Sequence, residues 1–409
     1  MGGWLVLFDD AVARKWWPFT LTRPAGELRF GAYTLRERAA LATGLGCRGH
    51  IAADHLTEFD EPAAPPVVPA VTGTVDNDTL FLSSRAVLEA AQALSLPSGE
   101  AILTINGEPC GWFVPAGSQA PPPEFFLDPG DSAPSSIPRV ATAGRVIRHV
   151  WELVTANADQ LARDIGTRFA GHPRPTLPEG VRVIGDALLV IGDGVEIDPG
   201  VIFDLRRGPI WIEDGATVSA FTLLAGPAHV GPRTALLGGV FDTVAAGPHC
   251  KLRGEIQHSV VLGYSNKSHD GHLGHAYVGA WVNLGANTTN SDLKNNYGNV
   301  SIWTPDGMVD TGERKLGCLI GDHVKTAIGT LINTGTVIGT GANVFGNGFP
   351  PKYVPPFTWG TGDAGNEYDL EKFLATAATV MSRRNVELTE RQRRLLAAAW
   401  DLGRNHHDA

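Results

Sequence analysis

Apolar residues recur every six positions through the second half of the chain. From Ile320 the sequence divides into IGDHVK, TAIGTL, INTGTV, IGTGAN and VFGNGF, and the first residue is aliphatic in four of these five hexads. The same register appears upstream from Val183, in segments such as IGDGVE and VGAWVN. A six-residue period fits neither an amphipathic helix nor a long alternating strand. It predicts a solenoid of short strands joined by tight glycine turns over residues 183–348.

One segment interrupts the hexads. Residues 291–317, which read SDLKNNYGNVSIWTPDGMVDTGERKLG, keep no six-residue register and predict an inserted loop or hairpin. Insertions of this length in a compact fold usually carry function or contacts, so we expect this one to lie near a site.

Strand-like and helix-like patterns alternate before the solenoid, in residues 1–112. The strand patterns are WLVLFDD, DTLFLSS and the pair AILTINGEPCGWFVP, and the helical patterns are LRERAALATGLG and SRAVLEAAQALS. Such alternation predicts a small α/β domain built on a parallel sheet.

Three further segments complete the predicted organisation. Residues 113–138 are rich in Pro, Ser and Gly and predict a linker. Residues 139–166 space their apolar side chains as a helix does and predict a connection between the two halves. Residues 365–406 predict two helices broken near Asn385, which would cover the open edge of the last coil.

The bulk composition narrows the classes of partner. A net charge of −10 over 409 residues argues against a nucleic acid, whose binding depends on Lys and Arg. No long apolar run predicts a membrane span, and the start MGGWLVLFDDA has neither a signal-peptide pattern nor a myristoylation signal. The four cysteines are far apart without a CxxC pair, which favours reduced thiols. We therefore expect a cytoplasmic protein.

Three histidines replace the apolar pattern within the solenoid. The segment KSHDGHLGHAYVG places His269, His272 and His275 three residues apart. A zinc site is one interpretation, but positions three apart on a strand face opposite sides, so convergence on one ion needs a bent loop or several subunits. General base catalysis is the other interpretation, because imidazole titrates near neutral pH.

The sequence around these histidines resembles a known enzyme family. NKSHDGHLGH, WVNLGAN and SDLKNNYG are similar to the acetyltransferase half of the bifunctional bacterial enzyme that makes UDP-N-acetylglucosamine. The resemblance to an alternative bacterial form of that enzyme extends to FTLTRPAGELRFGAYTL and GFPPKY, and so covers the whole chain. It implies an α/β nucleotidyltransferase-like domain, a left-handed parallel β-helix of the hexapeptide-repeat type with C-terminal helices, and assembly as a homotrimer.

The resemblance also implies roles for individual residues. His269 would be the general base in the transfer of an acetyl group from acetyl-CoA to an amino-sugar phosphate such as glucosamine-1-phosphate. The substrate would be held by Lys267, His272, Asn283, Lys294, Asn296 and Tyr297, and acetyl-CoA by Lys325, Ile328 and Gly346. The chain departs from the family pattern at His272, where the family has a tyrosine, and a few extra residues precede Asn296.

The α/β domain departs further from its family. Arg23 and Arg29 would contact nucleotide phosphates, but the glycine-rich turn that normally precedes them is missing. Arg85 stands where an Asp would hold magnesium, and Asp9 or Asp10 could take over that role. Two interpretations stay open: nucleotidyl transfer from UTP or another nucleotide with Mg²⁺, or an inactive regulatory or packing domain.

The function expected from these features is N-acetylation of an amino-sugar phosphate, in UDP-N-acetylglucosamine and cell-envelope sugar biosynthesis. Two alternatives belong to other classes. A sugar-nucleotide-binding scaffold or sensor would use the solenoid only to trimerise, and a metal-dependent β-helix hydratase would use the histidines as metal ligands.

Overall fold

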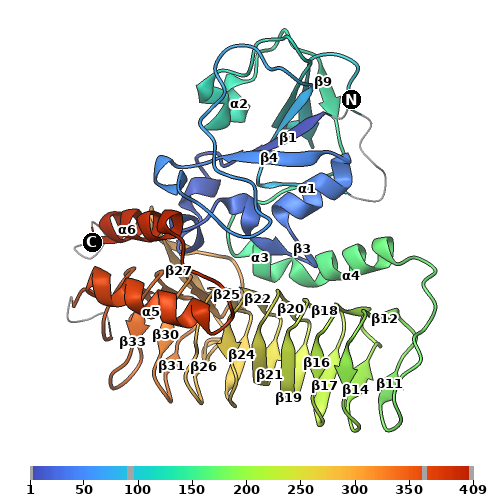
Figure 1. Ribbon diagram of the computed structural model, residues 1–409, viewed down its shortest axis with the longest axis vertical. Coiled ribbons are helices and arrows are strands. Elements are labelled where there is room, and N and C mark those ends of the chain that lie inside the picture. Colours follow the sequence, from blue (N-terminus) through green and yellow to red (C-terminus); the bar gives the residue numbers. More distant parts are fainter. Residues whose placement is uncertain (1–2, 90–95, 362–365, 405–409) are drawn as a thin grey trace.

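The computed structural model describes residues 3–89, 96–361 and 366–404. Figure 1 shows an α/β domain (blue to cyan) above a long β-solenoid (green to orange), with two helices (red) at one end of the solenoid. The predicted architecture, an α/β domain followed by a parallel β-helix and C-terminal helices, is confirmed. Within these residue ranges, no helix is both long and apolar enough to cross a membrane.

A six-stranded mixed sheet forms the core of the α/β domain, in the order β4-β1-β5-β8-β7-β9. Its strands are β1 (Trp4–Phe8), β4 (Gly46–Ile51), β5 (Thr79–Ser83), β7 (Ala101–Ile105), β8 (Glu108–Val114) and β9 (Arg139–Ala141). β1 pairs in parallel with β4 and β5, whereas β8 runs antiparallel to β5 and β7. The expected parallel sheet is thus mixed, because a tight turn at Asn106 and Gly107, both with positive φ, joins β7 directly to β8.

Helix α1 (Leu35–Thr43) agrees with the first helix predicted from the sequence, and it follows the short hairpin of β2 (Arg29–Phe30) and β3 (Tyr33–Thr34). A capping box starts the helix: the Thr34 side chain accepts from the Glu37 N–H, and the Glu37 side chain accepts from the Thr34 N–H. These two bonds satisfy backbone donors that a helix start leaves unpaired.

The second predicted helix, at residues 84–95, is wrong in its first half. Residues Ala86–Leu88 form strand β6, which pairs antiparallel with β10 (Gly144–Val146). A Cβ at Gly144 would lie 2.3 Å from the carbonyl oxygen of Val87, so the glycine permits this close pairing. Tertiary pairing therefore overrides the local helical pattern, and the rest of that segment lies outside the described residues.

The segment predicted as a linker, 113–138, is packed into the α/β domain. Phe125 and Phe126 are buried against Phe8, with ring centroids 5.6 and 5.5 Å away. Aromatic burial therefore outweighs the linker-like composition. The predicted connecting helix, 139–166, begins as strands β9 and β10 and becomes helical only later. The helices of the two segments are α2 (Pro129–Ser132), α3 (Glu152–Thr155) and α4 (Asn157–Arg168).

The solenoid is a parallel β-helix with three sides. The side that we call the domain face consists of β12 (Leu189–Ile191), β15 (Ile210–Ile212), β18 (Ala228–Val230), β20 (Ala245–Ala246), β22 (Val260–Gly263), β25 (Tyr277–Ala280), β29 (Cys318–Ile320), β32 (Thr336–Ile338) and β34 (Tyr353–Val354). The asparagine face consists of β13 (Glu196–Ile197), β16 (Thr217–Val218), β23 (Asn266–Lys267), β30 (Lys325–Thr326) and β33 (Asn343–Val344). The open face consists of β11 (Arg182–Ile184), β14 (Ile202–Asp204), β17 (Thr222–Ala225), β24 (His272–Gly274), β26 (Thr289–Asn290) and β31 (Leu331–Ile332). Two longer strands continue from the asparagine face onto the open face, β19 (Ala235–Asp242) and β21 (Lys251–Gln257).

Bulky side chains stack at the corner between the domain face and the asparagine face. His249, Tyr264, Trp281 and His323 occupy this corner in four coils, each with φ between 54° and 62°. Their ring centroids are 4.8, 4.3 and 6.4 Å apart along the series, with nearly parallel planes. Positive φ is unfavourable for such residues, and ring stacking between coils offsets part of that cost.

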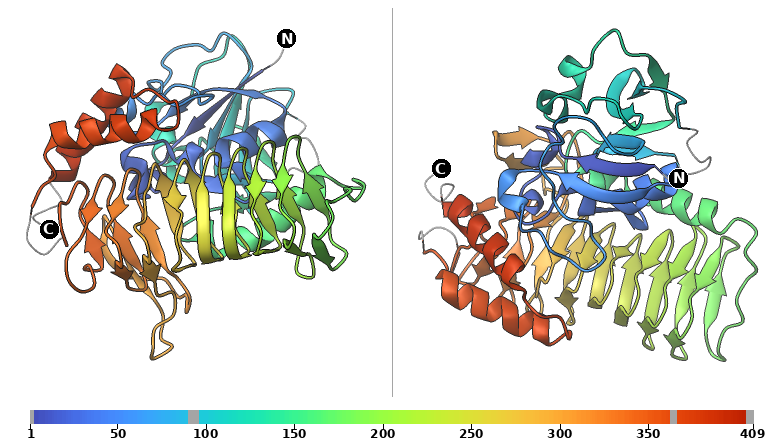
Figure 2. Two further views of the ribbon diagram at one scale, coloured as in Figure 1. Left: turned by 60° about the horizontal axis from the view of Figure 1, so that its bottom comes forward. Right: turned by 45° about the horizontal axis from the view of Figure 1, so that its top comes forward.

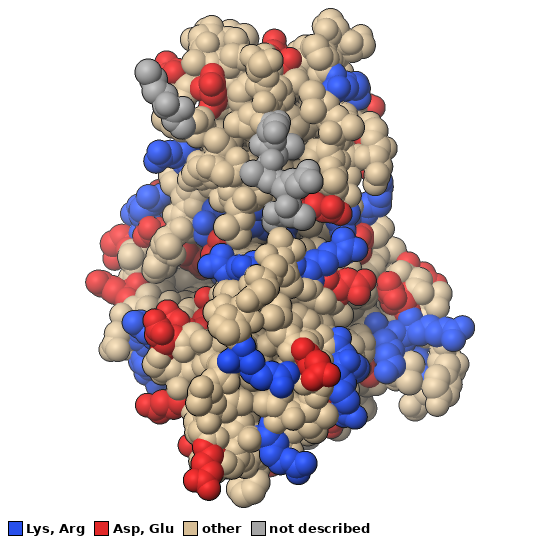
Figure 3. Space-filling view, turned by 90° about the vertical axis from the view of Figure 1, so that its right-hand side faces the viewer, with Lys and Arg blue, Asp and Glu red and all other residues tan. Residues whose placement is uncertain are grey.

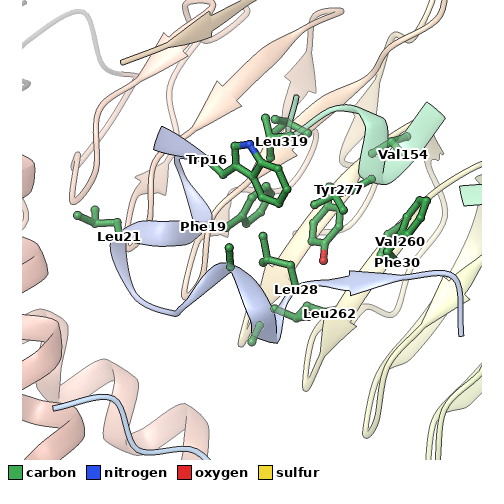
Figure 4. Packing of buried hydrophobic residues seen from close by; sticks show 14 of the residues in the cluster. Trp16, Phe19, Leu21, Leu28, Phe30, Val154, Val260, Leu262, Tyr277 and Leu319 are labelled. Atoms are coloured by element: carbon green, nitrogen blue, oxygen red, sulfur yellow. The ribbon is translucent and has the colours of Figure 1, made fainter. Parts of the chain in front are cut away.

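The α/β domain lies across the domain face of the solenoid (Figure 2). Apolar side chains from both parts form one buried cluster, which Figure 4 shows from close by. At its centre the Tyr277 hydroxyl accepts from the backbone N–H of Arg29 at 2.7 Å and donates to the Arg29 carbonyl at 3.1 Å. The cluster includes Trp16, Phe19, Leu28, Phe30, Val260, Leu262, Tyr277 and Leu319.

Helices α5 (Leu370–Ser382) and α6 (Glu390–Arg404) follow the last coil and are separated at Asn385, whose φ is 56°. Phe373 of α5 packs edge-on against Phe357 of the last turn, with centroids 5.0 Å apart. The predicted insertion, residues 291–317, contains a hairpin of β27 (Ser301–Thr304) and β28 (Gly307–Asp310), as expected. The helices thus cover the end of the solenoid, and the hairpin extends from its side.

Candidate functional site

The asparagine face aligns polar residues from successive coils. Bridges join Asn266 to Asn283, Asn283 to Lys325 and Lys325 to Asn343. The Asn266 amide nitrogen lies 3.5 Å from the Asn283 side-chain oxygen, and Asn283 is exposed. The structure therefore brings Asn283 and Lys325, predicted from separate motifs, onto one side of the molecule.

Lys267 lies on this face as well, but its side chain points inward. It is paired in register with Leu252, a residue of the solenoid core, and is only 2 % exposed. Its ammonium donates to the backbone carbonyls of His269 at 2.9 Å and Arg253 at 3.3 Å. Burial lowers the pKa of Lys267 to about 8. This geometry makes Lys267 a support for the turn that carries His269, not a ligand exposed to a phosphate.

His269 itself lies on an exposed turn between β23 and β24, at the corner between the asparagine face and the open face. Its imidazole forms no hydrogen bond or ion pair with any residue in the described part of the chain. A general base is usually oriented by a third group. Within the described residues of one chain, His269 lacks such a partner.

The other two predicted histidines do contact carboxylates. His275 Nδ1 lies 2.7 Å from Asp292 Oδ2, and this hydrogen bond lowers the pKa of Asp292. His272 Nδ1 lies 3.6 Å from Glu255 Oε1. The ring of His258, one coil away, stacks on His275 with centroids 4.7 Å apart.

We call the contacting residues His272, His275, His258, Glu255 and Asp292 the histidine cluster. The sequence analysis did not predict the last three of these residues. The spacing of one coil, 17 residues, is the signal that could have identified all three. His258 and Asp292 each lie 17 residues from His275, and Glu255 lies 17 residues from His272. Residues one coil apart lie over each other in a parallel β-helix, and Glu255 likewise pairs with His272 across adjacent coils.

A groove lies beside the last coils of the solenoid. It has a volume of about 330 Å³ and is lined by Ile328, Gly346, Leu331 and Phe345, among others. Ile328 is 79 % exposed, so its side chain is free to contact a ligand. Lys325 does not reach this groove, because its ammonium donates to the carbonyls of Trp281 and His323, each at 2.9 Å, and burial lowers its pKa to about 7.

Lys294 and Asn296 line a separate depression of about 370 Å³, where the insertion leaves the solenoid. Tyr297 stands beside it, 69 % exposed and with a φ of 56°. The depression is at the corner between the open face and the domain face, whereas His269 is at the other end of the open face. One chain therefore does not bring these two groups of predicted residues together.

In the α/β domain, Arg23 is buried against the solenoid. Its guanidinium donates to Asp322 Oδ2 at 2.8 and 2.9 Å and to both carboxylate oxygens of Glu61 at 2.8 and 2.9 Å. Burial alone disfavours the charged guanidinium, but these two carboxylates outweigh it and raise the pKa of Arg23. Arg29 is 6 % exposed and donates to the Ala32 carbonyl. Both arginines join the domain to the solenoid, which leaves neither open to a nucleotide phosphate.

Magnesium was expected at the ends of strands β1 and β5, and an ion pair occupies this position. Arg85 contacts Asp10 at 2.7 to 2.9 Å, and Asp9 accepts from Ser84 at 2.6 Å and from the Ala25 N–H at 2.8 Å. Burial raises the pKa of Asp9, which disfavours the charged form that Mg²⁺ requires. Among the described residues no three His, Cys, Asp or Glu gather as a metal site. These residues do not fit Mg²⁺.

Comparisons with known proteins agree with this two-part organisation. Residues 5–172 match the family model described as sugar nucleotidyl transferase. The chain is 32% identical over 91 residues to a bifunctional sugar-1-phosphate nucleotidylyltransferase/acetyltransferase of Sulfurisphaera tokodaii, which covers 22% of this chain and 23% of the relative. It is 27% identical over 197 residues to the bifunctional protein GlmU of Methanococcus aeolicus, covering 48% of this chain and 42% of the relative.

A third relative is the bifunctional protein GlmU of Herminiimonas arsenicoxydans, which is 27% identical over 167 residues, or 34% of this chain and 36% of the relative. These matches confirm the predicted resemblance to the bifunctional sugar nucleotidyltransferase/acetyltransferase family. The chain spans less than half the length of each of these curated relatives.

Proposed function

We propose that the protein is an acetyl-CoA-dependent N-acetyltransferase that acts on an amino-sugar phosphate of the glucosamine-1-phosphate type. The observation that carries the proposal is the solenoid itself, in which a polar face, a histidine-bearing corner and an exposed groove follow one another over neighbouring coils. Similarity to bifunctional nucleotidylyltransferase/acetyltransferases supports the same class of reaction. Biosynthesis of UDP-N-acetylglucosamine and cell-envelope sugars is the pathway that such a product would serve.

The reaction needs a base and a place for each substrate. The sugar amine attacks the thioester carbonyl, a C–N bond forms, and the imidazole takes the proton that the amine gives up. When the tetrahedral intermediate collapses, the C–S bond breaks and the thiolate leaves, so the same proton can pass to sulfur. The pantetheine arm would lie in the groove beside Ile328 and Gly346.

A homotrimer would complete the site. His269 stands at one corner of the coil, and Lys294, Asn296 and Tyr297 stand at another, so solenoids packed side by side can present both sets to one cleft. The α/β domain covers the domain face, and Arg384, just after helix α5, contacts Asn266 on the asparagine face, so the open face is the side proposed for such packing. In this arrangement a carboxylate from a neighbouring chain could orient the His269 ring.

His269 is the proposed base, and His272 is the second candidate, because Glu255 stands beside its Nδ1. The test measures thiol release from acetyl-CoA with glucosamine-1-phosphate. His269→Ala should lower turnover by about two to four decades, the usual loss when a general base is removed. The matched control is His172→Ala, which removes an exposed histidine outside the solenoid. A loss confined to His272→Ala would transfer the role to His272.

The α/β domain is proposed to act in packing, because the Arg85–Asp10 pair closes the edge that nucleotidyl transfer would use. Incubation with UTP, Mg²⁺ and a sugar phosphate should then release no pyrophosphate, while acetyl transfer proceeds. Release of pyrophosphate would contradict this part of the proposal. If the protein binds sugar nucleotides but releases no thiol, the sensor alternative replaces the enzyme.

A further inference from the structure

A cleft of about 870 Å³ opens between helix α1, the β6–β10 pair and helix α4. We call it the arginine cleft, because four arginines line it. On this side of the molecule, several Lys and Arg side chains lie along the boundary between the α/β domain and the solenoid (Figure 3). The cleft is separate from the histidine cluster, from the groove beside Ile328 and from the depression lined by Lys294. The arginines are Arg38, Arg145, Arg163 and Arg168.

Two of these arginines have carboxylate partners. Arg38 is buried and makes a two-pronged ion pair with Asp164, at 2.6 and 2.7 Å. Arg163 stands 3.6 Å from Glu89 in an exposed pair. Among the described residues, Arg145 and Arg168 form no ion pair. The lining therefore carries four cationic and two anionic groups, an excess of two positive charges on a chain whose net charge is −10.

Aromatic rings hold both unpaired guanidinium groups in place. Arg145 lies over the ring of Phe30, 5.4 Å from its centroid, and Arg168 lies at the same distance from the ring of Trp211. Phe30 belongs to the α/β domain and Trp211 to strand β15 of the solenoid. Such stacking fixes the plane of a guanidinium while its N–H donors stay available.

The rest of the wall is apolar. Leu41 of α1 is 47 % exposed, and Val87 and Leu88 of β6 line the cleft beside Tyr33. Small-molecule sites commonly combine such a wall with a few placed polar groups in volumes of roughly 300 to 1,000 Å³. The arginine cleft has both properties.

We propose that the arginine cleft binds an organic phosphate, with its phosphates between Arg145 and Arg168 and its ring or sugar on the apolar wall. Phosphate oxygens match the forked donors of a guanidinium, and a diphosphate can engage two of them at once. The two arginines come from β10 and α4, and their rings from the α/β domain and the solenoid. A bound diphosphate would therefore link the α/β domain, helix α4 and the solenoid at the point where they meet.

The test uses the full chain and calorimetric titration with three probes: inorganic pyrophosphate, UDP and uridine. Wild-type protein should bind UDP and pyrophosphate, more weakly as salt increases, and should not bind uridine measurably. The double variant R145Q/R168Q should lose at least tenfold in affinity for both phosphates. The control R206Q/R253Q removes two exposed arginines of the solenoid, which pair with Asp204 and Asp270, and should leave the affinity unchanged.

Equal UDP affinity in the double variant and the control would overturn the proposal, and so would the absence of phosphate binding to wild-type protein. If R145Q/R168Q does not fold, R145K/R168K preserves the charge and removes the fork, and should still lower UDP affinity several-fold. The readout is binding alone, so the proposal stands or falls independently of acetyl transfer.

Discussion

The ion pair between Arg23 and Asp322 is the contact on which attachment of the α/β domain to the solenoid should depend most. Asp322 Oδ2 accepts from the Thr22 hydroxyl at 2.8 Å and from Arg23 at 2.8 and 2.9 Å, while Oδ1 accepts from the Ala280 N–H at 2.7 Å. Both side chains of the pair are at most 3 % exposed. Asp322→Asn keeps the shape but has only one oxygen, so the amide nitrogen must face either the guanidinium or the Ala280 N–H.

Removing one charge from a buried pair typically costs about 3–5 kcal/mol. Glu61 stays beside Arg23 and offsets part of the loss, so we expect about 3 kcal/mol for Asp322→Asn. The matched control is Asp306→Asn, which breaks another pair between the domain and the solenoid, with Lys15 at 2.7 Å. That pair is exposed, and its loss should cost less than about 1 kcal/mol.

Urea unfolding followed by tryptophan fluorescence measures both losses, because Trp281 lies beside the buried ion pair. The expected result is a lower unfolding midpoint for Asp322→Asn than for Asp306→Asn. If the two variants differ by less than about 1 kcal/mol, the reasoning about burial is refuted.

Two further predictions concern stability. The pKa values of Lys267, about 8, and Lys325, about 7, lie below the ordinary 10.5, so between pH 7 and 10 the unfolded chain holds protons that the folded one has lost. The unfolding free energy should therefore rise over this range, and Lys267→Met or Lys325→Met should flatten the rise in urea unfolding at several pH values; a flat wild-type profile would count against both assignments. Phe373→Ala should cost about 3–5 kcal/mol, because the ring is 2 % exposed against the last coil, whereas Phe221→Ala, at an 85 % exposed ring, should stay within about 0.5 kcal/mol. Equal midpoints for the two phenylalanine variants in thermal unfolding would contradict this difference.

The solenoid could be predicted from the sequence because its determinants are local. Each hexad specifies one short strand and one turn, so a repeated pattern such as that after Ile320 predicts the coil without knowledge of distant contacts. The break at Asn385 and the hairpin between β27 and β28 were predictable for the same reason.

The errors arose where distant segments meet. Residues Ala86–Leu88 became a strand because β10, far along the chain, pairs with them. The inward direction of Lys267 follows from its register with Leu252 in the preceding coil, which its local sequence does not reveal. Asp292, the partner of His275, lies one coil of 17 residues further along the chain, but the hexad pattern that would align the two residues stops at residue 291.

The repeats also did not predict that the α/β domain covers the domain face of the solenoid. Tyr277 occupies an ordinary strand position, and its contact with Arg29 joins residues 248 positions apart. Arg23 and Arg29 were predicted to meet a nucleotide, but the structure uses them to join the two parts. A charged residue near a family motif can therefore lie in an interface between two parts of the protein. Only the tertiary contacts show that it does.

The most direct test of the proposed function is to detect the acetylated product itself. Full-length protein, acetyl-CoA and glucosamine-1-phosphate are incubated together, and the sugar phosphate is analysed by mass spectrometry. The account predicts a product heavier by one acetyl group, formed in equal amount to the free thiol and strongly reduced in His269→Ala. Folded wild-type protein that acetylates no amino-sugar phosphate would contradict it.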